Sequence, residues 1–150
     1  MALARTAAKI AFTAADYLIP RPRGPRVLIY HQVGAGLGRQ MEVTTEDFAR
    51  QLDWLGDNRE IVSFDEAISR WEDPDADQLV ALTFDDGYAD TYTTAYPRLE
   101  ERGAPFLIYL ATESIETGVP LGPAGPADPL NWDQIVDMLG SGLVTIGVHT

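Results

Sequence analysis

The stretch LVALTFDDG, residues 79–87, decides how the rest of the chain is interpreted. A largely apolar run ends here at two adjacent carboxylates, Asp85 and Asp86, and at Gly87. A run of this length, rich in Leu, Val and Phe, predicts a buried strand, and a glycine after it permits the positive φ that a sharp exit needs. Acids at the end of a buried strand need hydrogen-bond donors, a cation or a metal as partners. The alternative is an ordinary Asp-Gly turn with solvated side chains, and the stretch taken alone fits both interpretations.

The composition is that of a globular protein and excludes several functions. The 150 residues are 45% apolar and 23% charged, which suits one domain with a sizeable core. The net charge of -12 argues against nucleic acid as a partner, because phosphate binding needs clustered Lys and Arg. The sequence has no cysteine, which excludes disulfides, thiolate catalysis and Cys-ligated zinc.

The first 25 residues differ from the rest and form a separate N-terminal segment. Residues 1–19 carry apolar side chains at helical spacing, which predicts an amphipathic helix that packs on the domain or touches a membrane surface. This segment is too short and too polar to span a membrane, and it resembles a secretory signal only loosely. Residues 20–25 form a stiff Pro-rich linker. Two locations stay open: cytoplasmic or membrane-peripheral, or outside the cytoplasm if the segment directs export.

In residues 26–150 the sequence alternates between strand and helix patterns. Short apolar runs predict five strands, at residues 27–30, 60–62, 79–84, 106–110 and 144–148. Helices are predicted at residues 44–58, 64–71 and 131–139 and in part of 88–102, and loops at 32–40 and 112–129. This alternation predicts an α/β fold with a parallel sheet and right-handed crossovers.

Four polar side chains follow directly after predicted strands. They are the two acids Asp85 and Asp86 and the only two histidines of the chain, His31 and His149. The carboxyl ends of parallel strands meet at one edge of a sheet, where functional sites are built. A single histidine at a strand end is more often structural, but two of them with a paired acid at a third strand indicate a functional edge.

Carboxylate and imidazole ligands suit zinc or another divalent transition metal. Adjacent residues in a straight strand point to opposite faces, but at a strand end that turns, Asp85 and Asp86 can both approach one site. One of them could then bind the metal while the other takes a proton from water. A glycosidase needs two carboxyl groups roughly 5–9 Å apart across a sugar, for which neighbouring residues are poorly placed.

The residues around the two acids resemble a known family. TFDDG at residues 83–87 is similar to the first signature of polysaccharide deacetylases with the NodB-homology domain, and His149-Thr150 is similar to the opening of their second signature, His-Ser/Thr-x-x-His. The early Tyr-His pair resembles the branch that contains exported poly-N-acetylglucosamine deacetylases. The similarity runs from about Val27 to the end of the chain and includes LIYH (28–31), FARQL (48–52), YAD (88–90) and NWDQ (131–134).

The resemblance implies a fold, a reaction and a role for each residue at the strand ends. The family fold is a distorted, incomplete (β/α) barrel, and the reaction is metal-dependent hydrolysis of N-acetyl groups on an amino-sugar polysaccharide, with release of acetate. Asp85 would be the general base that activates water. Asp86 and His149 would bind a divalent metal, expected to be zinc. We add His31 as a candidate proton donor, because it reaches the same edge of the sheet.

The sequence also departs from the family pattern. It stops at Thr150, before the second histidine of the metal signature and before the later signatures, which supply an Arg partner, part of the substrate groove and, in most members, a catalytic His. About five strands cannot close a barrel that usually takes ~250 residues. We therefore expect residues 26–150 to be the N-terminal part of a longer deacetylase domain that is inactive alone. The alternative is a complete small protein with a vestigial site.

Two other functions stay open. A catalytically inactive carbohydrate-binding relative would use aromatic side chains near the strand ends as sugar platforms. Tyr30 and Tyr88 are the substrate-binding candidates in either case, while Trp132 is expected to pack in the core. A different metal hydrolase or a glycosidase could also use a parallel α/β scaffold. A histidine three or four positions after Thr150 would support deacetylation, and its absence there would support binding only.

Overall fold

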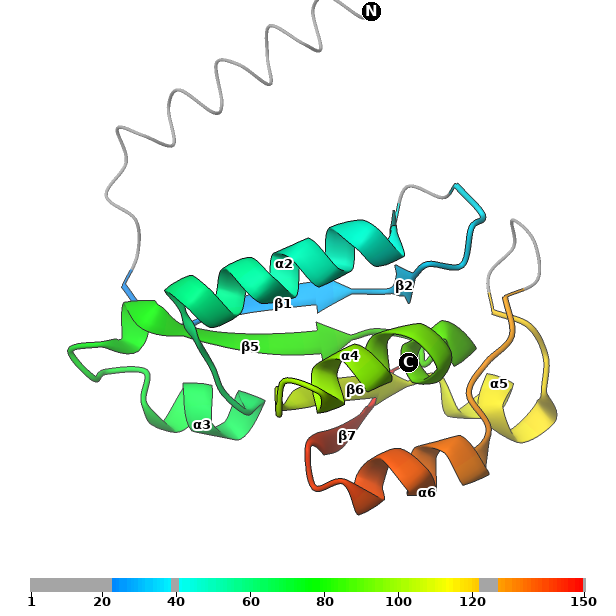
Figure 1. Cartoon of the computed structure of the whole chain (residues 1–150). Coiled ribbons are helices and arrows are strands. Elements are labelled where there is room, and N and C mark those ends of the chain that lie inside the picture. The colour runs from blue at the N-terminus through cyan, green and yellow to red at the C-terminus, as the bar shows by residue number, and fades with distance from the viewer. Residues whose placement is uncertain (1–22, 39–40, 122–126, 150) are drawn as a thin grey trace, which may run out of the picture.

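The computed structural model describes residues 23–38, 41–121 and 127–149 (Figure 1). The predicted N-terminal helix at residues 1–19 lies outside these residues. Among the helices that are described, none is both long enough and apolar enough to cross a membrane.

A parallel sheet forms the centre of the fold (Figure 1). Its main path is β1-β5-β6-β7, and the short strand β4 pairs with the start of β5. Each of these pairs is parallel, as the alternation of strands and helices predicted. The strands are β1 (Arg26–Tyr30), β4 (Glu60–Ile61), β5 (Leu79–Phe84), β6 (Phe106–Leu110) and β7 (Val144–Val148).

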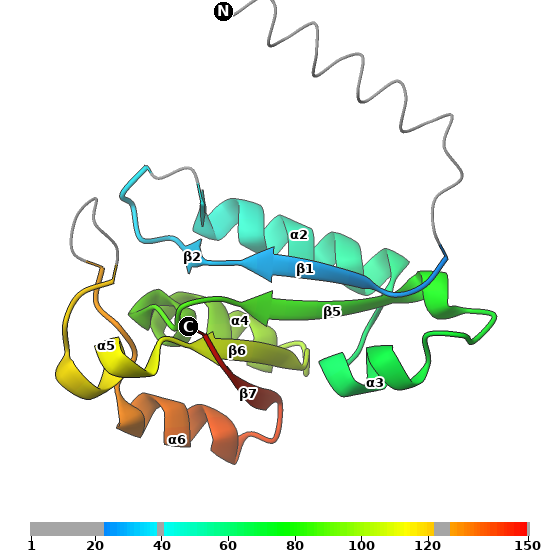
Figure 2. The same cartoon turned by 180° about the vertical axis from the view of Figure 1, so that it is seen from behind.

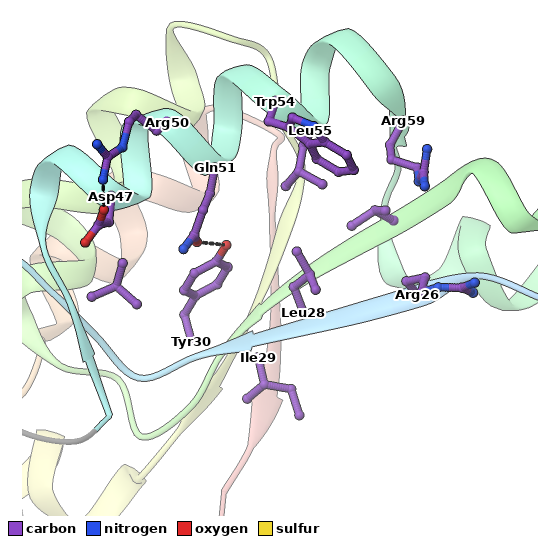
Figure 3. Close-up of a pocket in the computed structure, with 12 residues that line it drawn as sticks. Arg26, Leu28, Ile29, Tyr30, Asp47, Arg50, Gln51, Trp54, Leu55 and Arg59 are labelled. Atoms are coloured by element: carbon purple, nitrogen blue, oxygen red, sulfur yellow. Dashed lines mark hydrogen bonds and ion pairs between the residues drawn. The ribbon is translucent and has the colours of Figure 1, made fainter. Parts of the chain in front are cut away.

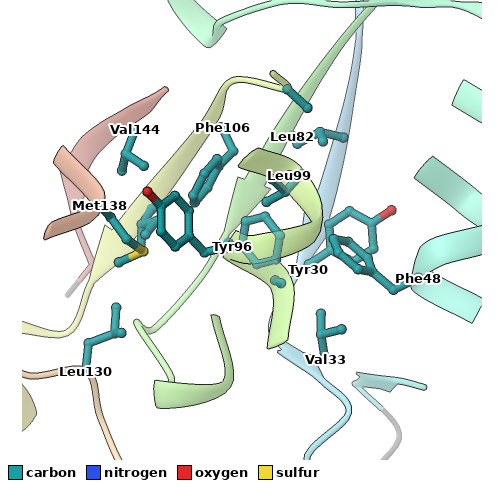
Figure 4. Close-up of a cluster of buried hydrophobic side chains, with 14 of the residues drawn as sticks. Tyr30, Val33, Phe48, Leu82, Tyr96, Leu99, Phe106, Leu130, Met138 and Val144 are labelled. Carbon is teal, nitrogen blue, oxygen red and sulfur yellow. The ribbon is translucent and has the colours of Figure 1, made fainter. Parts of the chain in front are cut away.

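Strand β5 is buried along its whole length, because helices or loops cover both of its faces. Its side chains alternate between the faces, as in any extended strand. Leu82 and Phe84 belong to the main apolar core, which Figure 4 shows between the sheet and its helices. Leu79 and Ala81 point to the other face and pack against a smaller cluster around α3 (Phe64–Ser69). The quoted stretch is therefore the buried strand that its composition predicted.

Three helices pack on the face that carries the main core: α2 (Thr45–Asn58), α4 (Tyr96–Glu100) and α6 (Trp132–Gly140). In Figure 2, which shows the opposite side, the strands lie in front of α2 and α4. The predicted helix starts are confirmed for two of them. The Thr44 hydroxyl accepts the Asp47 N–H at 3.1 Å, and Asn131 and Gln134 form a reciprocal capping box at α6.

Two segments that were predicted to be loops contain regular structure. Within residues 32–40, β2 (Gln32–Val33) pairs with β3 (Glu42–Val43), and α5 (Thr112–Thr117) lies within residues 112–129. Two-residue strands and a six-residue helix are too short to produce a clear periodic pattern, so the sequence did not reveal them. The remaining elements are a 3₁₀ turn, η1 (Ala76–Gln78), and a π-helical turn, η2 (Thr91–Ala95), which leads into α4.

One face of the sheet is only partly covered. Ile29 of β1 is 61% exposed and Val148 of β7 is 68% exposed, although both are apolar. Parallel sheets are ordinarily covered on both faces, and in a closed barrel this face would be the interior. The parallel sheet with helices packed on its outer side is therefore a partial (β/α) barrel.

Candidate active site

The turn after β5 presents its two acids in different directions. The Asp85 N–H donates to the Tyr30 carbonyl at 2.9 Å, which continues the pairing of β5 with β1. The chain then enters the left-handed region at Asp86, with φ 72°, and at Gly87, with φ 77°. Among the described residues Asp86 is the only non-glycine with positive φ, a conformation that Asp tolerates better than most side chains. This reversal separates the directions of the Asp85 and Asp86 carboxylates.

Each carboxylate faces one histidine. His31 Nε2 lies 3.8 Å from Asp85 Oδ2, and His149 Nδ1 lies 3.7 Å from Asp86 Oδ1. The four side chains are partly exposed, so water can reach them. Both separations exceed hydrogen-bond length. The ligand atoms of a tetrahedral metal site, with bonds of about 2.0–2.2 Å, lie about 3.4 Å from one another, so the distance between Asp86 and His149 suits two ligands of one ion.

The structure thus brings together the four residues predicted at the strand ends. His31 follows β1, the two acids follow β5, and His149 follows β7. Strand β6 lies between β5 and β7, and the carbonyl of its last residue, Leu110, accepts the His149 N–H at 2.9 Å. In the part of the chain that the structure describes, no group of three or more His, Asp and Glu side chains is arranged to hold a metal. The described site therefore supplies two candidate ligands.

A hollow of about 370 Å³ adjoins the site on the partly covered face of the sheet. Asp85 and His149 line it together with the apolar side chains of Ile29 and Val148 and with Tyr109. The mixture of polar groups at one end and apolar walls elsewhere is typical of ligand pockets.

Tyr30 does not line this site, which corrects its predicted role in substrate binding. Its side chain is on the helical face of β1, one position away from the partly covered face, and is 6% exposed. Its ring stacks on Phe84 and meets Phe48 edge-on. Its hydroxyl donates to Gln51 Oε1 at 2.8 Å, as Figure 3 shows. Burial raises the pKa of this hydroxyl. Tyr30 therefore packs in the core and does not line the hollow beside the two acids.

The other two aromatic residues also differ from expectation. Tyr88 is buried against Leu121 and Ala127, so its ring is not a free platform. Trp132, expected in the core, is instead 46% exposed and donates from Nε1 to Glu116 Oε2 at 3.0 Å. The sequence pattern at a strand end or a helix start does not reveal which aromatic ring a neighbouring loop covers. The burial of Tyr88 and the exposure of Trp132 could therefore not be predicted.

Sequence reasoning missed Asp90 as part of the site. Asp90 Oδ1 accepts the Val33 N–H at 3.1 Å, and Oδ2 accepts a hydrogen bond from Gln32 Nε2 at 3.4 Å. Burial raises the pKa of Asp90 to about 6, although both hydrogen bonds act in the opposite direction. The available signal was its place four residues after Asp86, in the same turn that carries both acids.

A larger groove, about 690 Å³, lies between β1 and α2 and away from the two acids (Figure 3). Its lining includes Arg26, Trp54 and Arg59, and an ion pair joins Arg50 to Asp47 at one end. Neither Asp85 nor Asp86 nor either histidine lines it. This groove is therefore separate from the candidate active site.

The comparisons with known proteins identify the class of protein. The sequence model of the family described as polysaccharide deacetylase matches residues 72–150, more than half of the chain. The chain therefore belongs to the polysaccharide deacetylase family. The matched region begins just before β5 and includes Asp85, Asp86 and His149.

Individual relatives agree with this assignment. A protein named putative polysaccharide deacetylase YxkH, from Bacillus subtilis (strain 168), is 28% identical over 92% of this chain and 46% of its own length. The structure of IcaB from Ammonifex degensii matches with a TM-score of 0.70 and 32% identity, over 87% of this chain and 54% of that one. A de-N-acetylase from Aggregatibacter actinomycetemcomitans matches with a TM-score of 0.69 and 29% identity, over 84% and 54% respectively. This chain spans about half the length of these relatives.

Proposed function

We propose that this chain is the N-terminal part of a metal-dependent deacetylase that hydrolyses N-acetyl groups on an amino-sugar polysaccharide. The observation that carries the proposal is the pairing of each acid with its own histidine, Asp85 with His31 at 3.8 Å and Asp86 with His149 at 3.7 Å. One structural relative is a de-N-acetylase, which supports cleavage of an amide and not of an ester. The share of the relatives' length that this chain spans supports a longer parent protein.

Asp86 and His149 would hold the metal. Their facing oxygen and nitrogen atoms are a donor set that zinc accepts, and catalytic zinc sites commonly have three protein ligands. The third ligand is expected to be a histidine after Thr150. When bound, the metal would polarise the N-acetyl carbonyl and lower the pKa of the attacking water.

Asp85 and His31 would move the protons. Asp85 accepts a proton as the water oxygen forms its bond to the carbonyl carbon. The bond from that carbon to nitrogen then breaks, and the amine leaves with a proton that His31 can donate. The products are acetate and the free amino sugar. No Arg or Lys side chain pairs with Asp85 among the described residues, so its carboxylate keeps the lone pairs that this role needs.

A non-catalytic carbohydrate-binding relative is the second candidate. The observation in its favour is that only two candidate metal ligands come together in the described residues. Continuing the sequence beyond Thr150 separates the candidates, because a histidine three or four positions later supports the metal site.

Acetate release tests the proposed reaction. A protein that continues through the rest of the domain should release acetate from an N-acetylated glucosamine oligosaccharide, lose this activity on chelation, and regain it with zinc. The 150-residue chain alone should release none. An extended, folded, zinc-loaded protein that released no acetate from any N-acetylated glycan would refute the proposal.

A further inference from the structure

We propose that Asp90 is a positioning residue that holds His31 beside Asp85. The inference rests on the proposed function, because it assigns His31 the role of proton donor. Asp90 lies on the same turn as the two acids but makes no contact with a reacting group. Its carboxylate binds instead the two residues that follow His31, Gln32 and Val33.

His31 is fixed on both sides by this one turn. On its N-terminal side the Tyr30 carbonyl accepts the Asp85 N–H at 2.9 Å. On its C-terminal side Asp90 accepts the Val33 N–H at 3.1 Å and the Gln32 side chain at 3.4 Å. The turn from Asp85 to Asp90 therefore sets where the backbone of His31 lies relative to the Asp85 carboxylate.

Asp90 is half-buried and holds two residues that are themselves buried. Gln32 and Val33 are almost fully buried, so an unpaired Val33 N–H would be costly. Asp90 occupies the cap position of η2, yet its side chain makes no capping hydrogen bond there. An acid at a helix start ordinarily caps its own helix. Here the carboxylate is directed to β2, away from that helix.

The chain packs closely against its surroundings at Gly34. It has φ 72°, and a Cβ at this position would lie 2.3 Å from Thr45 Oγ1. Its N–H donates to the Val43 carbonyl at 2.8 Å. The chain after Val33 is thus confined against the start of α2. If the Asp90 contact were lost, the backbone would therefore shift on the other side of Val33, at His31.

Asp77 provides a matched control. Its Oδ1 accepts the Gly24 N–H at 2.7 Å, just before β1, whereas Asp90 accepts the Val33 N–H just after it. Both acids fix the backbone beside the same strand, but only Asp90 lies at the end that carries His31. A purely structural role would make the two residues equivalent.

The experiment compares Asp90→Leu, Asp90→Asn and Asp77→Leu in the 150-residue chain by NMR. In Asp90→Leu we expect exchange of the Val33 amide hydrogen to accelerate at least about tenfold, and the imidazole signals of His31 to shift while those of His149 stay in place. Asp90→Asn keeps an acceptor oxygen and should preserve both signals. Asp77→Leu should leave both histidines unchanged. If Asp90→Leu does not fold, Asp90→Ser, whose hydroxyl is too short to reach both partners, replaces it.

Kinetics of a protein extended beyond Thr150 supply a second readout. Asp90→Leu should lower kcat about 10²-fold, as expected for a misplaced catalytic group, while KM changes less than threefold. Asp90→Asn should keep most of the wild-type kcat. Unchanged His31 signals in a folded Asp90→Leu or Asp90→Ser variant would overturn the inference, as would equal shifts in Asp77→Leu. Because the NMR result does not depend on turnover, its failure is distinguishable from failure of the proposed reaction.

Discussion

The two ends of the sheet both gather carboxylates but use them differently. Near the amino end of β5, one guanidinium, that of Arg70, lies within ion-pair distance of four exposed acids: Glu60, Glu66, Asp73 and Asp75. Hydrogen bonds that it donates to Glu60 and Glu66 raise the pKa of Arg70. At the carboxyl end, Asp85 and Asp86 face histidines, and no Arg or Lys pairs with them in the described residues.

This difference shows which acids are available for chemistry. A carboxylate paired with arginine keeps its charge but has its lone pairs occupied. A carboxylate beside an imidazole, at more than hydrogen-bond length, can still take a proton or a metal. The carboxyl end is therefore the end at which we propose the reaction, and the amino end is a surface ion-pair network. Substitutions of the acids at the carboxyl end should mainly lower activity, and substitutions at the amino end should mainly change stability.

Asp86→Ala should have the largest effect on function. Removing one of the three expected ligands should abolish tight zinc binding and acetate release in an extended protein, because the two remaining ligands bind metal weakly. Isothermal titration with zinc measures the first and acetate release the second. Retention of stoichiometric zinc by the variant would show that Asp86 is not a ligand.

Asp85→Asn should remove turnover but spare the metal. An amide cannot act as a base, and general base catalysis contributes about 10²–10⁴-fold to rate. We expect zinc affinity within threefold of the wild type and a loss of kcat in that range. A variant that lost both zinc binding and turnover would show that Asp85, like Asp86, is needed to bind the metal.

Asp90→Asn should change the pH dependence of stability. The folded state binds a proton at Asp90 with a pKa of about 6, above the ordinary value of 3.8, so the ionised form destabilises the fold. The free energy of unfolding of the wild type should fall, relative to that of the variant, as pH rises from 4 to 7. Urea denaturation at both pH values measures this. A difference between the two proteins that did not vary with pH would contradict a raised pKa for the half-buried Asp90 carboxyl.

Tyr30→Phe should affect stability without affecting the site. It removes the hydrogen bond to Gln51, at a cost of about 1 kcal/mol, and leaves the stacked ring in the core. Urea denaturation should show this loss, while KM for an N-acetylated oligosaccharide in an extended protein should stay the same. A KM raised several-fold would restore Tyr30 to the substrate site.

Arg70→Met should have the smallest effect. The acids around it are exposed and screened by solvent, so the urea midpoint should fall only slightly, and less still at high salt. Acetate release by an extended protein should not change. A loss of activity comparable to that of Asp85→Asn would show that the two ends are coupled and would break the comparison.

The fold and the pairing of strand ends could be predicted because they depend on local pattern. Residues 79–84 form an apolar run of the length and composition typical of a buried strand, and parallel strands place His31 and His149 at the same edge as the acids. The region that the family model matches, residues 72–150, includes this strand, both acids and His149, but not His31.

The contacts of Asp90 and Tyr30 could not be predicted because they depend on three-dimensional packing. Asp90 binds a backbone group 57 residues away, and nothing in the sequence near it indicates that partner. Tyr30 ends a strand whose next residue, His31, faces the site, so a shift of one position separates the core from the active edge. The short strands β2 and β3, which create the partner of Asp90, give no pattern of their own.

Zinc titration of the 150-residue chain, observed through its two histidines by NMR, tests the central claim most directly. Zinc should shift the imidazole nitrogen signals of His149 and leave those of His31 nearly unchanged, and Asp86→Ala should remove the shift. Shifts that persisted in Asp86→Ala, or a response at His31 with none at His149, would contradict the account.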